Sequence, residues 1–499
     1  MNQNRFTKRE NYQPSAGYRF LPFQFLQFDS DRKILVNEVG EYLFLENSVF
    51  EDFVGRTLKA SSDVYLDLKG KHFLFDSSSA APFELLVTKY RTKRAFLAGF
   101  TKLHIFVVSL RCEHSCHYCQ VSRVSADRSL YDMSAETARR ALDLVFRSPA
   151  SDLKIEFQGG EPLLNFDRIV QTVNEAKDRA HDTGRHVQFV ITTNLALATD
   201  EILTFCHENN IVLSTSLDGP AFIHNKNRPR PGNNSYELTL QNLQRAREIL
   251  GFDQIAAIMT TTRLSLSHPR EIVDEYVLQG FQSIFLRALS PYGFAVKTVK
   301  SIGYSTDEFL VFYKEALDYI IELNLNGTHL VETYAQILLT RILTPFTTGY
   351  VDLQSPSGGG IGVAVYNYDG DVYASDESRM LAEMGDLQFK LGNVHADSYA
   401  DMFGGELLRS LVTSSCVESM PGCADCAFQS FCGADPIFNY ATQADMVGHI
   451  PTSDFHKKNF FIIKYLLTLY EADPAIRKLF WAWVHNIPLN QFQHHEVTT

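Results

Sequence analysis

Six short apolar runs, each separated from the next by a helical pattern, constrain the fold more than any other feature of the 499 residues. Most of their positions are β-branched or apolar, as in strands that are buried on both faces. The runs lie at Leu103–Leu110, Leu153–Gln158, His186–Thr192, Ile211–Leu217, Gln254–Thr260 and Gln282–Leu289. Repeated strand–helix units predict an α/β fold with a parallel sheet and right-handed crossovers. The size fits a partial (β/α)6 TIM-like barrel, whose chemistry belongs at the C-terminal ends of the strands.

The helical segments between these runs carry residues that commonly begin or end a helix. Ser134 is placed to cap the first of them at its N-terminus. Gly251 can end a later helix, and Pro269 and Gly280 bracket the helix that follows. We therefore assign the barrel to residues 96–300.

Residues 1–95 have a different pattern and predict a separate small α+β module. Two strand-like stretches, Lys33–Val36 and Glu41–Leu45, flank Asn37–Gly40, a sequence suited to a hairpin turn. A short helical stretch follows, and then more strand-like sequence up to Phe75.

Beyond residue 300 the pattern divides the chain into three further parts. Residues 301–350 are helical in pattern and form a bridge. The stretch Ser355–Gly360 is a clear break, and Asp369–Gly370 then joins two short apolar runs as a hairpin. We expect one domain over residues 351–460 and a tail of one or two amphipathic helices over 461–499.

The composition indicates a globular protein and excludes some partners. Hydrophobic residues make up 45% of the chain, and the formal net charge is −12. A negative charge argues against nucleic acid or an anionic membrane as the main partner. Apolar runs of about 18 residues are missing, and Met1–Gln13 is polar, so the sequence predicts neither a transmembrane helix nor a secretory signal. We expect a cytoplasmic protein whose cysteines are reduced.

Three cysteines, Cys112, Cys116 and Cys119, follow the first predicted strand directly. A cubane iron–sulfur cluster has four irons, so three thiolates in one loop hold three of them and leave the fourth open to a ligand. A structural zinc site instead needs a fourth protein ligand, and His114 or His117 could supply it. The spacing alone therefore leaves zinc as an alternative.

The second predicted strand ends in Gln158-Gly159-Gly160-Glu161-Pro162. Two glycines allow the backbone to come close to a ligand, and a carboxylate with free carbonyls can accept from an ammonium group. Together with the C-x3-C-x2-C loop one strand earlier, this segment resembles the radical S-adenosylmethionine (SAM) superfamily. The resemblance implies a [4Fe–4S] cluster with an open iron for SAM. It also implies that Gln158, Gly159, Gly160 and Glu161 bind SAM.

The fourth predicted strand ends in Ser214–Pro220, and Arg228 follows. This region is similar to the branch of the superfamily that includes the anaerobic sulfatase-maturating enzymes. By that resemblance Ser216 and Arg228 contact SAM, and Tyr118 lies near its adenine. A turn-capping role for Ser216 and a surface ion pair for Arg228 are the structural alternatives. Asp218 is a candidate for the substrate pocket, although a carboxylate before a glycine also suits a turn without any function.

A second group of cysteines lies near the C-terminus. Three close thiolates in a reducing compartment indicate a metal site, and Cys423-x2-Cys426-x5-Cys432 resembles the core of a SPASM domain, the auxiliary cluster module of peptide-modifying radical SAM enzymes. The fourth ligand can be Cys416 or His456, because histidine can replace cysteine on iron. Structural zinc at these cysteines is the alternative.

The SPASM resemblance has two departures and one leftover cysteine. Ser375 and Pro436 stand where SPASM domains usually have cysteines, so we expect at most one auxiliary cluster. Cys206 lies on an apolar helical face and is expected to be a core thiol.

Two motif regions, Leu110–Arg123 and Gly422–Tyr440, resemble the His-Xaa-Ser system radical SAM maturases of the HxsB type. The resemblance implies modification of a ribosomally made peptide by hydrogen abstraction, alongside a second radical SAM protein. An electron donor such as flavodoxin or ferredoxin is implied as well. Residues 1–95 can be a peptide-recognition element of the PqqD-like kind or a purely structural extension.

Two other functions stay open on the sequence. One is a sulfatase-type maturase that acts on Cys or Ser of a folded protein. The other is a non-catalytic, zinc-stapled binding module, which would contain zinc and no iron.

Overall fold

A nine-stranded sheet dominates the computed structural model, which describes residues 17–119 and 127–492. Its strand order is β12-β10-β9-β8-β7-β6-β14-β15-β16. Six of these strands run parallel in chain order and confirm the predicted α/β fold with a parallel sheet. They are β6 (Leu103–Ser109), β7 (Asp152–Gly159), β8 (His186–Thr192), β9 (Val212–Ser216), β10 (Ile255–Thr260) and β12 (Leu286–Arg287).

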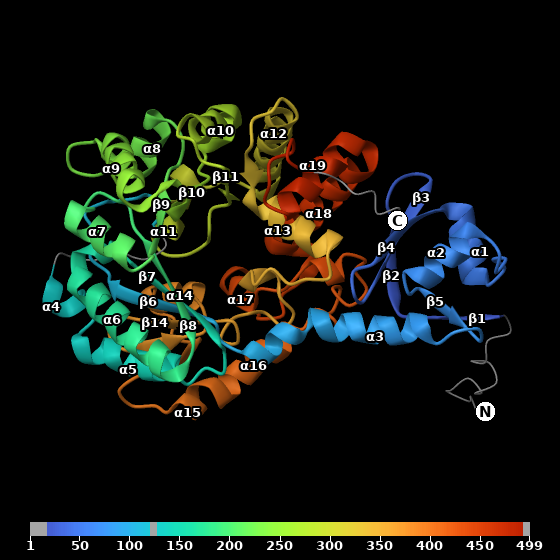
Figure 1. Cartoon of the computed structure of the whole chain (residues 1–499), viewed down its shortest axis with the longest axis horizontal. Helices are drawn as coiled ribbons and strands as arrows, with labels where there is room; N and C mark the ends of the chain where they lie inside the picture. Colours follow the sequence, from blue (N-terminus) through green and yellow to red (C-terminus); the bar gives the residue numbers. More distant parts are fainter. Residues whose placement is uncertain (1–16, 120–126, 493–499) are drawn as a thin grey trace.

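The helices that connect these strands pack against the sheet at the left of Figure 1. Ser134 accepts a hydrogen bond from the Thr137 amide and begins α5, as the sequence predicts. Gly251 ends α9 with a φ of 99°, and Pro269 is the first residue of α10. The helices of this half are α4 (Arg128–Tyr131), α5 (Ala135–Val145), α6 (Phe166–Thr183), α7 (Asp200–Glu208), α8 (Ala221–Asn227), α9 (Ser235–Leu250), α10 (Pro269–Leu278) and α11 (Phe294–Ile302).

The sixth predicted strand differs from the expectation, because Gln282–Leu289 is two short strands. β11 (Ser283–Ile284) turns away to pair with β13 (Val331–Glu332), and only β12 joins the barrel sheet beside β10. The Glu332 carboxylate accepts a hydrogen bond from the Leu286 amide at 3.1 Å. A carboxylate from a distant segment thus takes a backbone donor at the point where the run divides.

The hairpin predicted around Asp369–Gly370 is present and extends the barrel sheet. β14 (Val363–Tyr366) pairs in parallel with β6, and β15 (Asp371–Tyr373) and β16 (Lys390–Asn393) follow in antiparallel order. The predicted C-terminal helical tail is two helices. The helices beyond residue 300 are α12 (Thr306–Leu325), α13 (Thr333–Leu343), α14 (Asp376–Glu383), α15 (Tyr399–Gly404), α16 (Glu406–Ser414), α17 (Pro436–Gln443), α18 (Asp454–Ala472) and α19 (Pro474–Val484).

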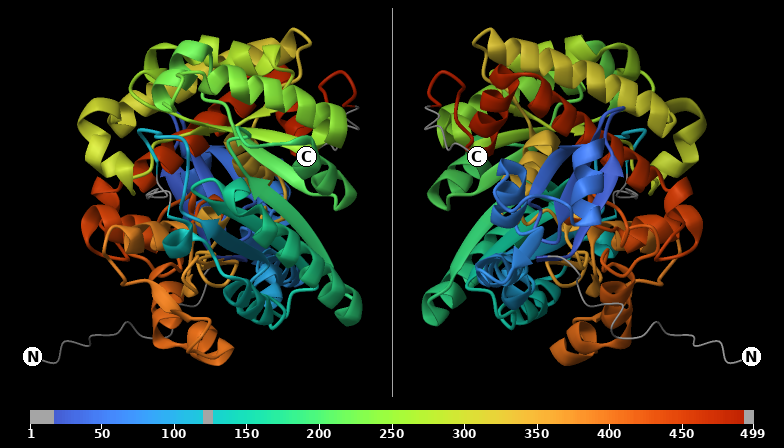
Figure 2. Two further views of the ribbon diagram at one scale, coloured as in Figure 1. Left: turned by 90° about the vertical axis from the view of Figure 1, so that its left-hand side faces the viewer. Right: turned by 90° about the vertical axis from the view of Figure 1, so that its right-hand side faces the viewer.

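The N-terminal module lies at the opposite end of the long axis from the barrel helices, and the right-hand view of Figure 2 faces it. It has a three-stranded antiparallel sheet, β2-β3-β4, that contains the predicted hairpin, and a separate β1–β5 pair. Its elements are β1 (Tyr18–Phe20), β2 (Phe23–Gln27), β3 (Arg32–Asn37), β4 (Tyr42–Glu46), α1 (Asn47–Gly55), α2 (Asp63–Gly70), β5 (Leu74–Asp76) and α3 (Ala81–Lys93).

The prediction of more strand-like sequence up to Phe75 holds only at its end, where β5 lies, because α2 occupies the segment before it. The Ser62 hydroxyl accepts from the Tyr65 amide and begins this helix. Tyr65 and Leu68, three residues apart, are both buried in the core of the module. The three-residue spacing of these buried residues is that of a helix, which is why this segment is not a strand.

The module also contacts the C-terminal cysteine region directly. The Gln24 side chain donates to the Ala424 carbonyl at 2.7 Å, and Lys93 Nζ donates to the Ser430 carbonyl at 2.7 Å. The ring of Tyr42 lies edge-on to Phe431, with the ring centres 6.3 Å apart. In the described part of the chain, no helix is long and apolar enough to cross a membrane.

Candidate active site

The first cysteine loop begins where β6 ends, at the C-terminal edge of the parallel sheet. Cys112, Cys116 and Cys119 are free and half-buried in it. Backbone hydrogen bonds hold the loop against the segment after α8, from the Ser115 amide to Pro229 O at 2.7 Å and from the His117 amide to Asn227 O at 3.1 Å. The three predicted cluster ligands therefore share one anchored loop. The part of the motif at 120–123 lies outside the described residues.

The two glycines at the end of β7 lie directly against this loop. The Gly160 amide donates to Ser109 O at 2.8 Å, and the Glu161 amide donates to Arg111 O at 2.7 Å. A Cβ on Gly159 would lie 2.0 Å from Ser109 O, and one on Gly160 would lie 2.3 Å from Arg111 O. The glycines thus allow the backbone of the cysteine loop to come close, which the sequence argument had attributed only to a ligand.

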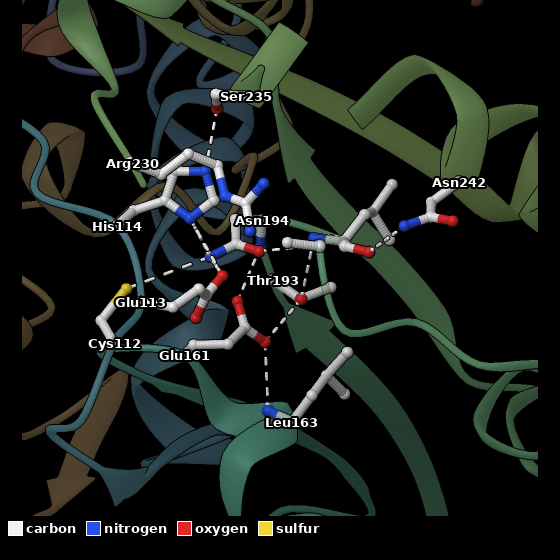
Figure 3. A network of polar contacts seen from close by, with 12 residues as sticks. Cys112, Glu113, His114, Glu161, Leu163, Thr193, Asn194, Arg230, Ser235 and Asn242 are labelled. Carbon is white, nitrogen blue, oxygen red and sulfur yellow. Dashed lines mark hydrogen bonds and ion pairs between the residues drawn. The ribbon is translucent and has the colours of Figure 1, made fainter. Parts of the chain in front are cut away.

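Glu161 is fully buried and joins the glycine segment to the end of β8 (Figure 3). Its carboxylate accepts from the Leu163 amide at 3.1 Å, the Thr193 hydroxyl at 2.6 Å and the Asn194 amide at 2.9 Å. Burial and the charge of Glu113 raise the pKa of Glu161, and the three donors oppose that shift. Most of its hydrogen-bonding capacity is used within the protein.

Asn194 then connects Glu161 to the cysteine loop (Figure 3). Its Nδ2 lies 2.7 Å from Glu113 Oε1, 3.0 Å from His114 Nδ1 and 4.0 Å from Cys112 Sγ. The sequence argument missed Thr193 and Asn194. The signal was available, because a polar pair directly follows the third barrel strand on the edge that carries the chemistry.

The predicted zinc alternative at this loop loses one of its two histidines. One potential ligand atom each from Cys112, Glu113 and His114 lies within 4.8 Å of the others. However, His114 Nδ1 is 2.9 Å from Glu113 Oε1, and its Nε2 is 2.9 Å from the Ser235 hydroxyl. Both ring nitrogens are therefore engaged, and His114 would have to break a buried hydrogen bond to bind a metal.

Tyr118, Asp218 and Arg228 form a second polar group beside the cysteines. The Tyr118 hydroxyl donates to Asp218 Oδ2 at 2.6 Å, and Arg228 Nε donates to the same oxygen at 3.2 Å. The Arg228 guanidinium lies 5.2 Å from the centre of the Tyr118 ring. Burial opposes the charge on Arg228, but Asp218 and Tyr118 outweigh it and raise its pKa. The ion pair of Arg228 is therefore buried, unlike the surface pair that the sequence left open.

Gln158 and Ser216 lie at the C-terminal ends of two barrel strands. Gln158 is on β7 opposite Val107, and Ser216 is the last residue of β9, opposite Ile258. Both side chains are half-buried, and among the described residues neither has a hydrogen-bond partner. They stay available for a ligand at this edge of the sheet.

At the second cysteine group, Cys426 and Cys432 add to the effect of burial and raise the pKa of Cys423, and Cys426 raises that of Cys432, so the three thiols are neighbours. Asn459 is fully buried, and among the described residues its Nδ2 makes no hydrogen bond of normal length and angle; the side chain lies near the Cys432 thiol, whose pKa it lowers. The Arg341 guanidinium donates to the Cys432 carbonyl at 3.0 Å. An orphaned amide donor and a buried cation beside a thiol fit an anionic sulfur centre.

Among the described residues, no hydrogen bond or ring contact joins either predicted fourth ligand to the other three cysteines. The Cys416 thiol donates to the Val412 carbonyl at 3.3 Å, one turn back along its own segment. The His456 ring packs on Phe460 with a centre-to-centre distance of 5.5 Å, and burial lowers its pKa. The identity of the fourth ligand stays a prediction.

Burial shapes the acidity of the thiols in both groups. It raises the pKa of Cys116 to about 12 and that of Cys432 to about 11. Thiols of this kind stay protonated at neutral pH, and bound metal deprotonates them outright. Cys206 is fully buried, as expected of a core thiol, and burial raises its pKa to about 12.

Comparisons with known proteins agree with this geometry. A model of the radical SAM superfamily matches residues 106–275. The chain is 23% identical over 238 residues to a cysteine-type anaerobic sulfatase-maturating enzyme of Clostridium perfringens, a match that covers 46% of this chain and 63% of that protein. The chain spans 48% to 64% of the length of the first curated relatives that it matches.

Two solved structures share the fold. Native anSMEcpe with bound AdoMet is 17% identical with a TM-score of 0.61, and the match covers 76% of this chain and 99% of that chain. Streptococcus suis SuiB bound to precursor peptide SuiA is 14% identical with a TM-score of 0.50, over 86% and 98%. Residues 106–275 of this chain therefore resemble a radical SAM domain, a family that uses a [4Fe–4S] cluster and S-adenosylmethionine as cofactors, and the C-terminal cysteines fit an auxiliary cluster.

Proposed function

We propose that this protein is a radical SAM enzyme that cleaves S-adenosylmethionine and modifies a ribosomally made peptide, most closely as a maturase of the His-Xaa-Ser system. The observation that carries the enzyme assignment is the docking of the Gly160–Glu161 backbone on the cysteine loop, through hydrogen bonds of 2.8 and 2.7 Å. It places the proposed SAM-binding segment beside three free thiols.

The proposed cofactor set assigns a role to each residue of the site. A reduced [4Fe–4S] cluster, when bound, supplies the electron that splits SAM into methionine and a 5′-deoxyadenosyl radical. Cys112, Cys116 and Cys119 would hold the cluster. Gln158, Ser216 and the segment Gly159–Glu161 would bind SAM at the strand ends, and Asn194 would keep the glycine segment in register with the loop.

The Tyr118–Asp218–Arg228 group would hold the side chains on one side of this site in fixed positions. Asp218 fixes the ring of Tyr118 and the guanidinium of Arg228 in place, so Tyr118 near the adenine and Arg228 near the ribose or carboxylate need no reorganisation when SAM binds. Asp218 therefore acts as a positioning residue in this proposal. The substrate-pocket role that its sequence context suggested is the alternative.

We assign the C-terminal region to a SPASM-like domain with one auxiliary iron–sulfur cluster on Cys423, Cys426 and Cys432, with Cys416 or His456 as fourth ligand. The N-terminal module contacts the loop between these cysteines and has a sheet edge to which a peptide can add a strand. The substrate peptide, an electron donor such as flavodoxin or ferredoxin, and a second radical SAM protein are the proposed partners. The proposed location is the cytoplasm.

A sulfatase-type maturase is the second candidate. The match to the sulfatase-maturating enzyme of Clostridium perfringens favours it, and so does the higher TM-score of the anSMEcpe structure. Both candidates share the SAM chemistry and differ in the substrate, a small precursor peptide or a folded sulfatase.

The SAM cleavage is tested by anaerobic reconstitution with iron and sulfide, followed by SAM and dithionite. Formation of 5′-deoxyadenosine is expected from the wild type and not from a Cys112→Ala/Cys116→Ala/Cys119→Ala variant. Cys206→Ala is the matched control, because it removes a core thiol outside both groups and should keep the product. Bound zinc without iron in the wild type would refute the enzyme and support the zinc-stapled module.

The substrate is tested by co-expression and mass spectrometry. A mass change on a precursor peptide with His-Xaa-Ser repeats supports the peptide maturase. A change only on a peptide that contains the Cys or Ser of a sulfatase site supports the second candidate.

A further inference from the structure

A cavity of about 410 Å³ lies between the last barrel strand and the C-terminal domain. Helix α11 separates it from the first cysteine loop. On one side of α11, the Phe294 amide donates to Cys119 O at 2.8 Å and the Thr298 hydroxyl donates to His117 O at 2.7 Å. On the other side, Ala295 and Val299 line the cavity. The cavity is therefore one helix away from the proposed radical chemistry.

Three half-buried carboxylates, Asp352, Glu377 and Asp435, line this cavity from three separate segments. Burial is the largest cause that raises the pKa at all three; Asp352 further raises the pKa of Glu377 and Asp435, and Glu377 raises that of Asp435. Like charges held this close in a partly dry space repel one another. Asp435 Oδ1 also accepts from two amides at the start of α17, which fixes its position.

Two cations, Arg287 and Lys458, line the same cavity without pairing to these acids. Over the described ranges 17–119 and 127–492, no ion pair within 4.0 Å joins either cation to any of the three carboxylates. Lys458 Nζ instead lies 5.0 Å from the centre of the Tyr334 ring. The exposed acid Asp454 also lines the cavity, so four acids face two bases, and the lining carries two uncompensated negative charges when all six groups are ionised.

Tyr292 provides an independent sign that this space takes a polar ligand. Its side chain is 1% exposed and lines the cavity, and within residues 17–119 and 127–492 its hydroxyl has no hydrogen-bond partner. Asp435, Glu377 and Asp352 are the charges that act on it, so the hydroxyl faces the acids. A buried hydroxyl without a partner costs free energy, which a ligand with a hydrogen-bonding group would recover.

We infer that this cavity binds a basic side chain of the peptide substrate, with its cation among the three carboxylates and its aliphatic stem against the aromatic wall. A cation relieves the repulsion of the acids, and the rings of Phe285 and Tyr350 on the cavity wall offer apolar contact to the stem. The assignment rests on the proposed peptide-modifying function and adds the class of residue that the enzyme recognises.

The test measures binding of three acetylated, amidated tripeptides, Gly-Lys-Gly, Gly-norleucine-Gly and Gly-Glu-Gly, to the reconstituted protein with SAM by anaerobic calorimetry. The lysine peptide is expected to bind about tenfold more tightly than the norleucine peptide. Glu377→Gln and Asp352→Asn should each weaken the lysine peptide by about tenfold and leave the norleucine peptide unchanged. Glu315→Gln is the matched control, because Glu315 is an exposed acid on α12 outside the cavity.

Equal affinity for the lysine and norleucine peptides, or tighter binding of the glutamate peptide, would overturn the assignment. So would the absence of any binding of the lysine peptide to the wild type at millimolar concentration. Formation of 5′-deoxyadenosine is measured on the same preparations. Discrimination between the peptides without SAM cleavage would refute the proposed function and support the cavity, whereas SAM cleavage without discrimination would refute the cavity alone.

Discussion

At the scale of single residues, the close approach of two backbone segments requires glycine at the end of β7. Gly159 and Gly160 lie against carbonyls of the segment that leads into the cysteine loop, and a methyl group at either position would overlap them. The Gly-Gly pair is thus required by the protein itself before any ligand binds. Because this segment lies so close to the loop, the side chain of the next residue, Glu161, reaches the residues that follow β8.

Gly160→Ala is expected to destabilise the protein by about 3 kcal/mol, because its Cβ would lie 2.3 Å from Arg111 O and the loop must move. Thermal unfolding measures the stability, and the iron content after reconstitution measures whether the loop still binds a cluster. Gly70→Ala is the control, since nothing lies within 4 Å of the added carbon. Equal unfolding temperatures for the two variants would contradict the packing argument.

Asp218→Asn is expected to cost about 3 kcal/mol, because it leaves the buried Arg228 charge without its partner. Arg228→Gln in the same background should recover part of that loss. A double-mutant cycle by chemical unfolding gives the coupling free energy between the two side chains. A coupling near zero would mean that the pair does not contribute to the site.

At the scale of elements, helix α11 joins the first cysteine loop to the cavity of the acids. One of its faces is hydrogen-bonded to the cysteine loop and the other lines the charged cavity. A shift of this helix would therefore change both regions together. Few of the contacts that hold α11 to the loop involve side chains, so the loss of a single hydroxyl group should measurably lower the stability.

Thr298→Val removes the hydrogen bond to His117 O and keeps the shape of the side chain. We expect a loss of about 1 kcal/mol and faster loss of iron to a chelator, because the loop is less firmly held. Thr468→Val is the control, since that hydroxyl bonds only to Lys464 O within its own helix. The same rate of iron loss in both variants would show that α11 does not support the loop.

Sequence patterns predicted elements whose signals are local. Strand β8 has the expected bounds, His186–Thr192, because it pairs with β7 and β9, the strands directly before and after it in the chain. The last barrel strand was not predictable, since Glu332 from a later segment meets the run where it divides. The cysteine groups could be located by spacing alone. Asp352, Glu377 and Asp435 could not be grouped, because only the tertiary fold brings three such distant positions together.

At the scale of the whole molecule, the acids of the cavity tie stability to pH. Burial, Asp352 and Asp376 raise the pKa of Glu377 to about 7, above its unfolded value of about 4.3. The neutral form therefore stabilises the fold below pH 4.3, and that contribution is lost as the pH rises through 7.

Glu377→Gln is neutral at every pH, so it should gain on the wild type as the pH rises. Between pH 4.5 and 7.5 the stability of the wild type relative to the variant should fall by about 2 kcal/mol, a value reduced for water in the cavity. Thermal midpoints at the two pH values measure the change. A constant difference would show that Glu377 titrates normally.

During biosynthesis, the contact between the N-terminal module and the second cysteine loop can form only after that loop has been made. Gln24 and Ala424 are 400 residues apart in the chain, yet they share a hydrogen bond. At ribosomal rates of roughly 5 to 20 residues per second, the module emerges roughly 20 to 80 seconds before its partner loop exists. During that interval the surface around Tyr42 that will cover Phe431 faces water or a chaperone. The second cysteine loop is therefore covered only after both of these distant segments have been synthesised.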